Sequence, residues 1–88
     1  MVQQRDIELF SPILRSILDL EITQGNSIVE TWNGWPNEQT IGIMLAKPFF
    51  VHYHYLPDNV EYREVNDPHY WKAEYEDKDT GHLLACRF

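Results

Sequence analysis

The chain has 88 residues, enough for one domain with a single core, here residues 1–88, and too few for a second. It holds seven basic and fourteen acidic residues, for a formal net charge of −7, and the basic residues are scattered singly. Nucleic-acid binding draws most of its affinity from phosphate neutralisation, so this composition argues against nucleic acid and anionic lipid as partners.

Cysteine content and hydropathy favour a cytoplasmic protein. Cys86 is the only cysteine, so no intramolecular disulfide can form. Asp6 and Glu8 stand where a secretion signal would need an apolar run. The longest apolar runs fall far short of the ~18 residues that span a bilayer, so we expect no membrane association.

The first predicted element is an amphipathic helix over residues 11–24, "SPILRSILDLEITQ". Ser11 can cap its first turn, Pro12 suits the first helical position, and Gly25 favours an end there. Apolar residues recur at three- and four-residue spacing: Ile13, Leu14, Ile17, Leu18 and Ile22. The remainder of the helix surface is polar: Arg15, Ser16, Asp19 and Glu21.

After Gly25 the hydrophobic period changes towards two, which predicts strands. We expect them at residues 27–32, 40–46, 49–55, 60–65, 70–76 and 82–88, with a hairpin turn at "DKDTG". Prolines flank the third strand and can shorten it. One helix must bury its stripe against a sheet, so the predicted fold is α+β. The helix should pack on one face of a four- to six-stranded antiparallel meander formed by residues 27–88.

The stretch "FFVHYHYLP", residues 49–57, raises the question of a metal site. In an extended chain one face would hold Phe49, Val51, Tyr53 and Tyr55, which we assign to the core. The other face would hold Phe50, His52, His54 and Leu56. Histidines at this spacing lie ~7 Å apart and can share a metal, but a site needs a third donor that no motif supplies. We therefore predict half-buried imidazoles that titrate near pH ~6.5, without metal or cofactor.

Patterns that would indicate catalysis fail on spacing. His82 and Cys86 share a strand face but lie ~13 Å apart, too far for a direct hydrogen bond. A calcium loop starting at Asp77 would need its glycine one place later than Gly81 and a glutamate where Phe88 stands. The four glycines are scattered and form no phosphate loop. We predict no catalytic residues and a protein that is not an enzyme.

An interaction surface remains as the expected functional feature. Residues 60–63 and 71–76 alternate apolar with charged types, so one face of both strands is aromatic and the other acidic. Trp35, in the loop "NGWPNEQ", either anchors a partner or folds over the sheet edge. The predicted partner-binding residues are Trp35, Phe50, His52, His54, Glu61 and Glu74.

The sequence therefore predicts a small acidic cytoplasmic protein that acts through protein–protein contacts. Inhibitors and immunity-type proteins that neutralise a basic toxin or nuclease share this physical profile. Self-association through the uncovered sheet face is a further expectation. The alternative is a metal- or small-ligand-binding protein that uses the pair His52 and His54.

Overall fold

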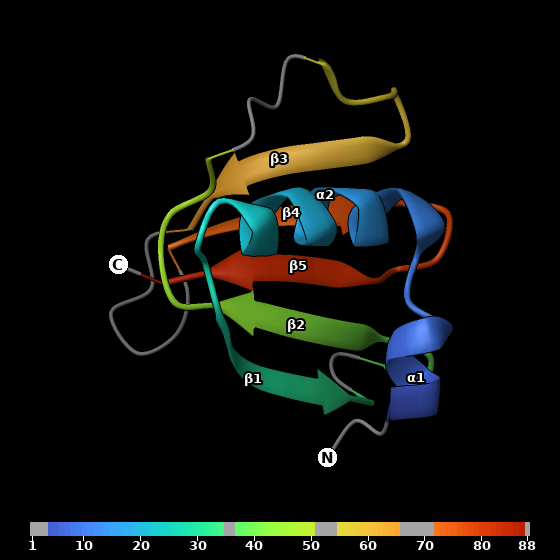
Figure 1. Ribbon diagram of the computed structural model, residues 1–88. Coiled ribbons are helices and arrows are strands. Elements are labelled where there is room, and N and C mark those ends of the chain that lie inside the picture. The colour runs from blue at the N-terminus through green and yellow to red at the C-terminus, as the bar shows by residue number, and fades with distance from the viewer. Residues whose placement is uncertain (1–3, 35–36, 51–54, 66–71, 88) are drawn as a thin grey trace.

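The structure is a computed structural model that describes residues 4–34, 37–50, 55–65 and 72–87. Within these residues, two helices precede a five-stranded sheet (Figure 1). The elements are α1 Gln4–Glu8, α2 Pro12–Thr23, β1 Ile28–Asn33, β2 Ile41–Leu45, β3 Val60–Glu64, β4 Ala73–Asp77 and β5 Leu83–Cys86. The predicted α+β class is confirmed.

Helix α2 begins and ends where its sequence predicts. The hydroxyl of Ser11 accepts the backbone N–H of Leu14 at 3.5 Å, and Pro12 occupies the first helical position. Gly25 follows the last turn at a φ of 98°, a conformation that costs glycine little. Neither helix, in the part of the chain that the structure describes, is long and apolar enough to cross a membrane.

The sheet is mixed, so the predicted antiparallel meander is wrong. Its strand order is β1-β2-β5-β4-β3, and β2 pairs with β5 in parallel while the other neighbours are antiparallel. The chain therefore crosses from β2 to the far edge at β3 and returns through β4 to place β5 in the centre. Strand β5, "LLAC", has no polar side chain and is buried throughout, as a strand covered on both faces requires. The predicted β4–β5 hairpin is confirmed, with Gly81 at a φ of 78°.

The predicted strand at 49–55 does not form at its described start. Phe49 and Phe50 belong to no strand, and residues 51–54 lie outside the described residues. Within this range the N–H of Phe50 donates to the Glu21 carboxylate, and just before it the N–H of Lys47 donates to the Asn26 side chain. These donors are therefore not available for a neighbouring strand.

One cluster of apolar side chains makes the main core. In Figure 1, α2 passes in front of β4 and runs beside β5, and it contacts both. Leu14, Ile17 and Leu18 from α2 share the cluster with Ile43, Leu45, Val60, Ala73, Tyr75, Leu84 and Cys86. The ring of Phe49 joins it, with its centroid 4.5 Å from that of Tyr75. The aromatic face predicted for residues 60–63 and 71–76 is the core face at its described positions, Val60, Tyr62, Ala73 and Tyr75.

The opposite side of the central strands is also buried, contrary to the expectation of an uncovered face. Met44, Leu83, Ala85 and Glu74 are each exposed by 5% or less. Met44 and Ala85 form a second small cluster against which Trp32 and Val65 pack. The Trp32 ring lies so close over Gly42 that a Cβ there would overlap it. The two edges of the sheet are formed by β1 and β3.

Replacing Gly42 with alanine tests the Trp32 contact. Gly42→Ala should lower the free energy of unfolding by about 1–3 kcal/mol, because the added methyl displaces the ring or the strand. Urea denaturation followed by circular dichroism measures the change. In a Trp32→Ala background the same substitution should cost less than about 0.5 kcal/mol. Equal losses in both backgrounds would contradict the contact.

Candidate functional site: the carboxylates around Arg63

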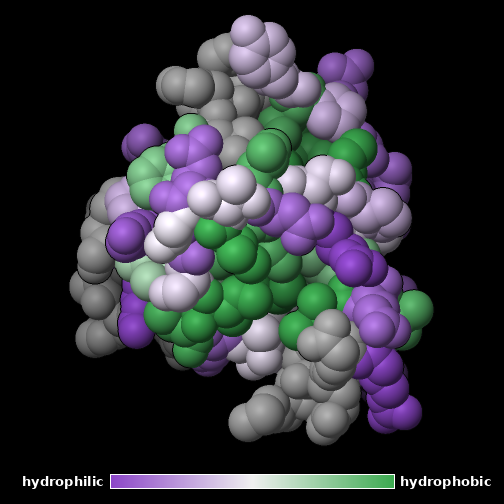
Figure 2. Space-filling view, viewed as in Figure 1, coloured by the Kyte–Doolittle hydropathy of each residue, from purple (hydrophilic) through white to green (hydrophobic). Residues whose placement is uncertain are grey.

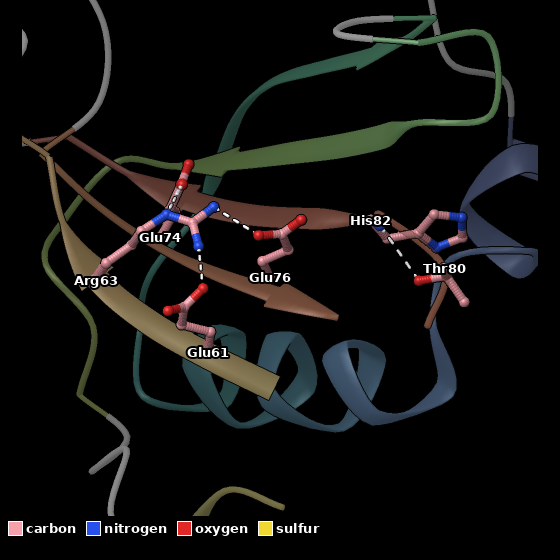
Figure 3. Close-up of polar contacts among 6 residues, drawn as sticks. All are labelled: Glu61, Arg63, Glu74, Glu76, Thr80 and His82. Atoms are coloured by element: carbon pink, nitrogen blue, oxygen red, sulfur yellow. Dashed lines mark hydrogen bonds and ion pairs between the residues drawn. The ribbon is translucent and has the colours of Figure 1, made fainter. Parts of the chain in front are cut away.

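Arg63 on β3 is surrounded by three carboxylates on the side of the sheet away from the main core (Figure 3). Its Nε donates to Glu74 Oε1 at 2.6 Å, Nη1 to Glu61 Oε2 at 2.6 Å and Nη2 to Glu76 Oε1 at 2.7 Å. The antiparallel register brings these residues together, since Arg63 lies opposite Glu74 and Glu61 opposite Glu76. We call Glu61, Arg63, Glu74 and Glu76 the acidic cluster.

The acidic cluster carries more negative than positive charge. Its three glutamates against one arginine leave a formal charge of −2 when all are ionised. Burial alone would lower the pKa of Arg63, but hydrogen bonding and charge attraction from Glu76 and Glu74 outweigh it and raise that pKa. The guanidinium therefore stays charged and holds the carboxylates in fixed positions. The Glu74 side chain is 7% exposed, whereas those of Glu61 and Glu76 are 46% and 30% exposed.

Two of the predicted partner-binding residues meet in this cluster. Glu61 and Glu74 are joined through Arg63, which the sequence placed on the same strand face but not at the centre of a network. Phe50 is 43% exposed and is not part of the acidic cluster, and its backbone N–H donates to the Glu21 carboxylate. Trp35, His52 and His54 lie outside the described residues, so their predicted roles stay predictions.

A buried serine, histidine and aspartate lie together at the start of α2. The Ser11 hydroxyl donates to the Asp77 carboxylate, and the Ser11 backbone N–H donates to His82 Nδ1 at 2.8 Å. In a hydrolase triad the imidazole stands between hydroxyl and carboxylate and takes the hydroxyl proton. Here the hydroxyl bonds directly to the carboxylate, so the imidazole has no such path. The arrangement instead ties the helix start to the β4–β5 hairpin, where the His82 N–H also donates to Thr80 Oγ1 at 3.2 Å (Figure 3).

Charge states in this group follow from its burial and hydrogen bonds. Burial lowers the pKa of His82, and the nearby Asp77 carboxylate opposes that effect in part. Burial would raise the pKa of Asp77, but hydrogen bonds from Ser11, Asp79 and Thr80 outweigh it and lower that pKa. A neutral imidazole that accepts at Nδ1 and an ionised carboxylate fit these directions.

Glu21 is a fully buried carboxylate. Its predicted place on the polar side of the helix is therefore wrong. It accepts the Phe50 N–H at 2.7 Å and the Asn26 side-chain amide at 3.1 Å. Asn26 in turn accepts the Lys47 N–H at 3.1 Å, so the pair anchors residues 47–50 to the end of α2. The helical spacing indicates this burial, because position 21 follows Leu14 by seven residues and Leu18 by three and so lies on the same face of the helix as these two leucines. Ile22, assigned to the buried stripe, is 44% exposed.

Cys86 and the acidic side chains do not form a reactive or metal-binding centre in the described parts of the chain. Burial, with the Glu21 charge adding to it, raises the pKa of the Cys86 thiol to about 11, although backbone hydrogen bonds oppose the rise. A thiol with that pKa is protonated at neutral pH and is a poor nucleophile. Among the described residues no group of three histidine, cysteine, aspartate or glutamate side chains is arranged to hold a metal ion.

Comparisons with protein-family models, with curated proteins and with solved structures return no match for this chain.

Removing the Glu21 carboxylate should destabilise the fold. Glu21→Ala leaves the part-buried N–H of Phe50 and the buried amide of Asn26 without this acceptor, and we expect a loss of about 2–4 kcal/mol in the free energy of unfolding. Asp19→Ala is the matched control, because Asp19 is an exposed acid on the same helix and should change stability by less than about 0.5 kcal/mol. Similar effects of the two substitutions in urea denaturation would contradict the anchoring role.

Stability should fall as the pH drops through about 6.5, the usual pKa of histidine. Because the pKa of His82 is lowered in the folded protein, the unfolded chain binds that proton more readily. The contribution of His82 is thus complete above pH ~6.5 and is lost below it. His82→Asn keeps an acceptor for the Ser11 N–H but does not titrate. The wild-type chain should lose more unfolding free energy than this variant between pH 7.5 and 5.5, and equal losses would exclude His82 as the cause.

Proposed function

We propose that this chain is a non-enzymatic cytoplasmic protein that binds a basic protein partner through the acidic cluster on β3 and β4. The observation that carries the proposal is the arrangement of Glu61, Glu74 and Glu76 around a single arginine. An inhibitor or immunity-type protein for a basic toxin or nuclease is the form of this function that we favour. The proposal includes an arrangement in which α2 covers one face of the sheet and the acidic cluster lies on the other.

Fixed carboxylates are suited to such a contact. Arg63 uses one oxygen of each glutamate, and the exposed side chains of Glu61 and Glu76 can turn their other oxygens towards a partner. Because Arg63 already restricts these glutamate side chains, they lose less conformational entropy when a partner binds them. The buried Glu74 side chain accepts from Nε of Arg63 and so restricts the guanidinium.

Charge across the chain supports the same partner class. The net charge of −7 attracts a basic protein at long range and repels polyanions. Such attraction speeds association and weakens as salt screens it, with a Debye length of about 10 Å at 0.1 M ionic strength.

The alternative function is metal or small-ligand binding through His52 and His54. Its basis is the spacing of that pair in the sequence, since both residues lie outside the described part of the structure. The protein-binding proposal is preferred because its residues have defined contacts in the structure.

Variants that remove negative charge from the acidic cluster test the proposal. Glu61→Gln/Glu76→Gln should weaken capture of basic proteins from a cell extract at least tenfold at 50 mM salt. Asp19→Asn/Glu38→Gln removes the same charge from exposed positions elsewhere and should weaken capture less than twofold. Raising the salt to 300 mM should release the wild-type partner.

The proposal fails if both double variants lose the partner equally, or if the captured proteins are acidic. It also fails if capture is unaffected by salt, because attraction between exposed charges is screened under those conditions.

A further inference from the structure

The two edge strands of the sheet differ in how they are protected. Strand β3, "VEYRE", carries Glu61, Arg63 and Glu64, and charges of this kind discourage pairing with another strand. Strand β1, "IVETWN", carries Glu30 as its single charged residue and has no proline or lysine. Among the residues that the structure describes, it pairs only with β2 and forms the other margin of the sheet (Figure 1).

A shallow groove follows the first half of β1, lined by Ile28, Val29, Glu30 and Thr31. Ile28 and Val29 are each 40% exposed, a high value for two adjacent aliphatic residues on a strand. A bulge lies between Ile28 and Glu30, and Val29 has no partner in the described β1–β2 register. Bulges redirect side chains, which accounts for two neighbours that line the same groove. Figure 2 shows a continuous hydrophobic surface below α2, over the part of the sheet where Figure 1 draws β2 and β1.

We propose that the β1 edge and its groove, Ile28–Asn33, dock an extended basic segment of a protein partner. This inference rests on the proposed function and adds to it the surface that binds partner backbone. An edge strand offers a row of backbone N–H and C=O groups to an added strand. Beyond the bulge, residues 30–33 keep a regular register with β2 and can extend the sheet. The groove at Ile28 and Val29 accepts an apolar side chain, and Glu30 faces a lysine or arginine of the added segment.

Charge favours a basic partner over a second copy of this chain. Two copies would bring together net charges of −7 each and two Glu30 side chains at one groove. A basic segment instead neutralises Glu30, the charged member of the groove lining. Backbone pairing provides affinity in this mode, and the side-chain groove provides selectivity.

Synthetic peptides test the docking surface directly. The probe is a ten-residue peptide that alternates lysine with valine and threonine, titrated into the isotope-labelled chain and followed by amide chemical shifts. We expect the largest shifts at Glu30–Asn33 and slower hydrogen exchange at β1 amides. The same peptide with alternate backbone nitrogens methylated cannot pair as a strand and should bind at least tenfold more weakly. A glutamate-for-lysine version should not bind.

Matched variants separate the groove from general charge effects. Val29→Lys should weaken binding of the lysine peptide at least tenfold. Ile22→Lys puts the same charge at an exposed apolar position on α2 and should weaken binding of that peptide less than threefold. Ile28→Ser, which removes apolar surface without adding charge, should weaken binding in a variant whose circular dichroism is unchanged.

Three outcomes would overturn the docking site. The first is the absence of shifts in β1 with the lysine peptide. The second is shifts confined to Glu61, Arg63, Glu74 and Glu76, which would leave the proposed function standing and move the contact to the acidic cluster. The third is a dimer in sedimentation that Val29→Lys dissociates, because the groove would then belong to a second copy.

Discussion

The parallel pairing of β2 with β5 is the constraint on which the rest of the structure depends. It places β5 in the middle of the sheet, so that Leu83–Cys86 are buried on every side. A central strand of this kind must be apolar throughout, and it moves the polar residues of the sheet towards its margins. The acidic cluster on β3 and β4 and the exposed groove of β1 occupy opposite margins for this reason.

Buried polar groups hold both ends of α2, the start against the β4–β5 hairpin and the end against residues 47–50. Ser11 joins the start of the helix to Asp77 and His82, and Glu21 joins its end to Asn26 and Phe50. Such groups are costly to bury unless every donor and acceptor finds a partner, so each favours one position of the helix relative to the segment that it contacts. The two polar connections orient the helix, while Leu14, Ile17 and Leu18 contribute most of the apolar burial from α2.

Local patterns predicted local structure well and predicted the pairing of distant segments poorly. Ser11, Pro12 and Gly25 located the helix, and the turn around Gly81 located the β4–β5 hairpin, because these depend on neighbouring residues. The order of strands depends on contacts between residues far apart, which alternation alone does not encode. The prediction for Glu21 was wrong because a charged residue type favours exposure, whereas its position on the helix is that of the buried face. The pairing of Glu61 with Glu74 through Arg63 needed the register of β3 against β4.

Residue-resolved hydrogen exchange of the native protein tests the central claim most directly, since it reports both the interior position of β5 and the open edge at β1. The account predicts that amides of Leu83–Cys86 exchange slowest, through global unfolding, and that alternate amides of β1 exchange rapidly from its outer side. It would be contradicted if every amide of β1 were as protected as those of β5, or if β5 exchanged as rapidly as an edge strand.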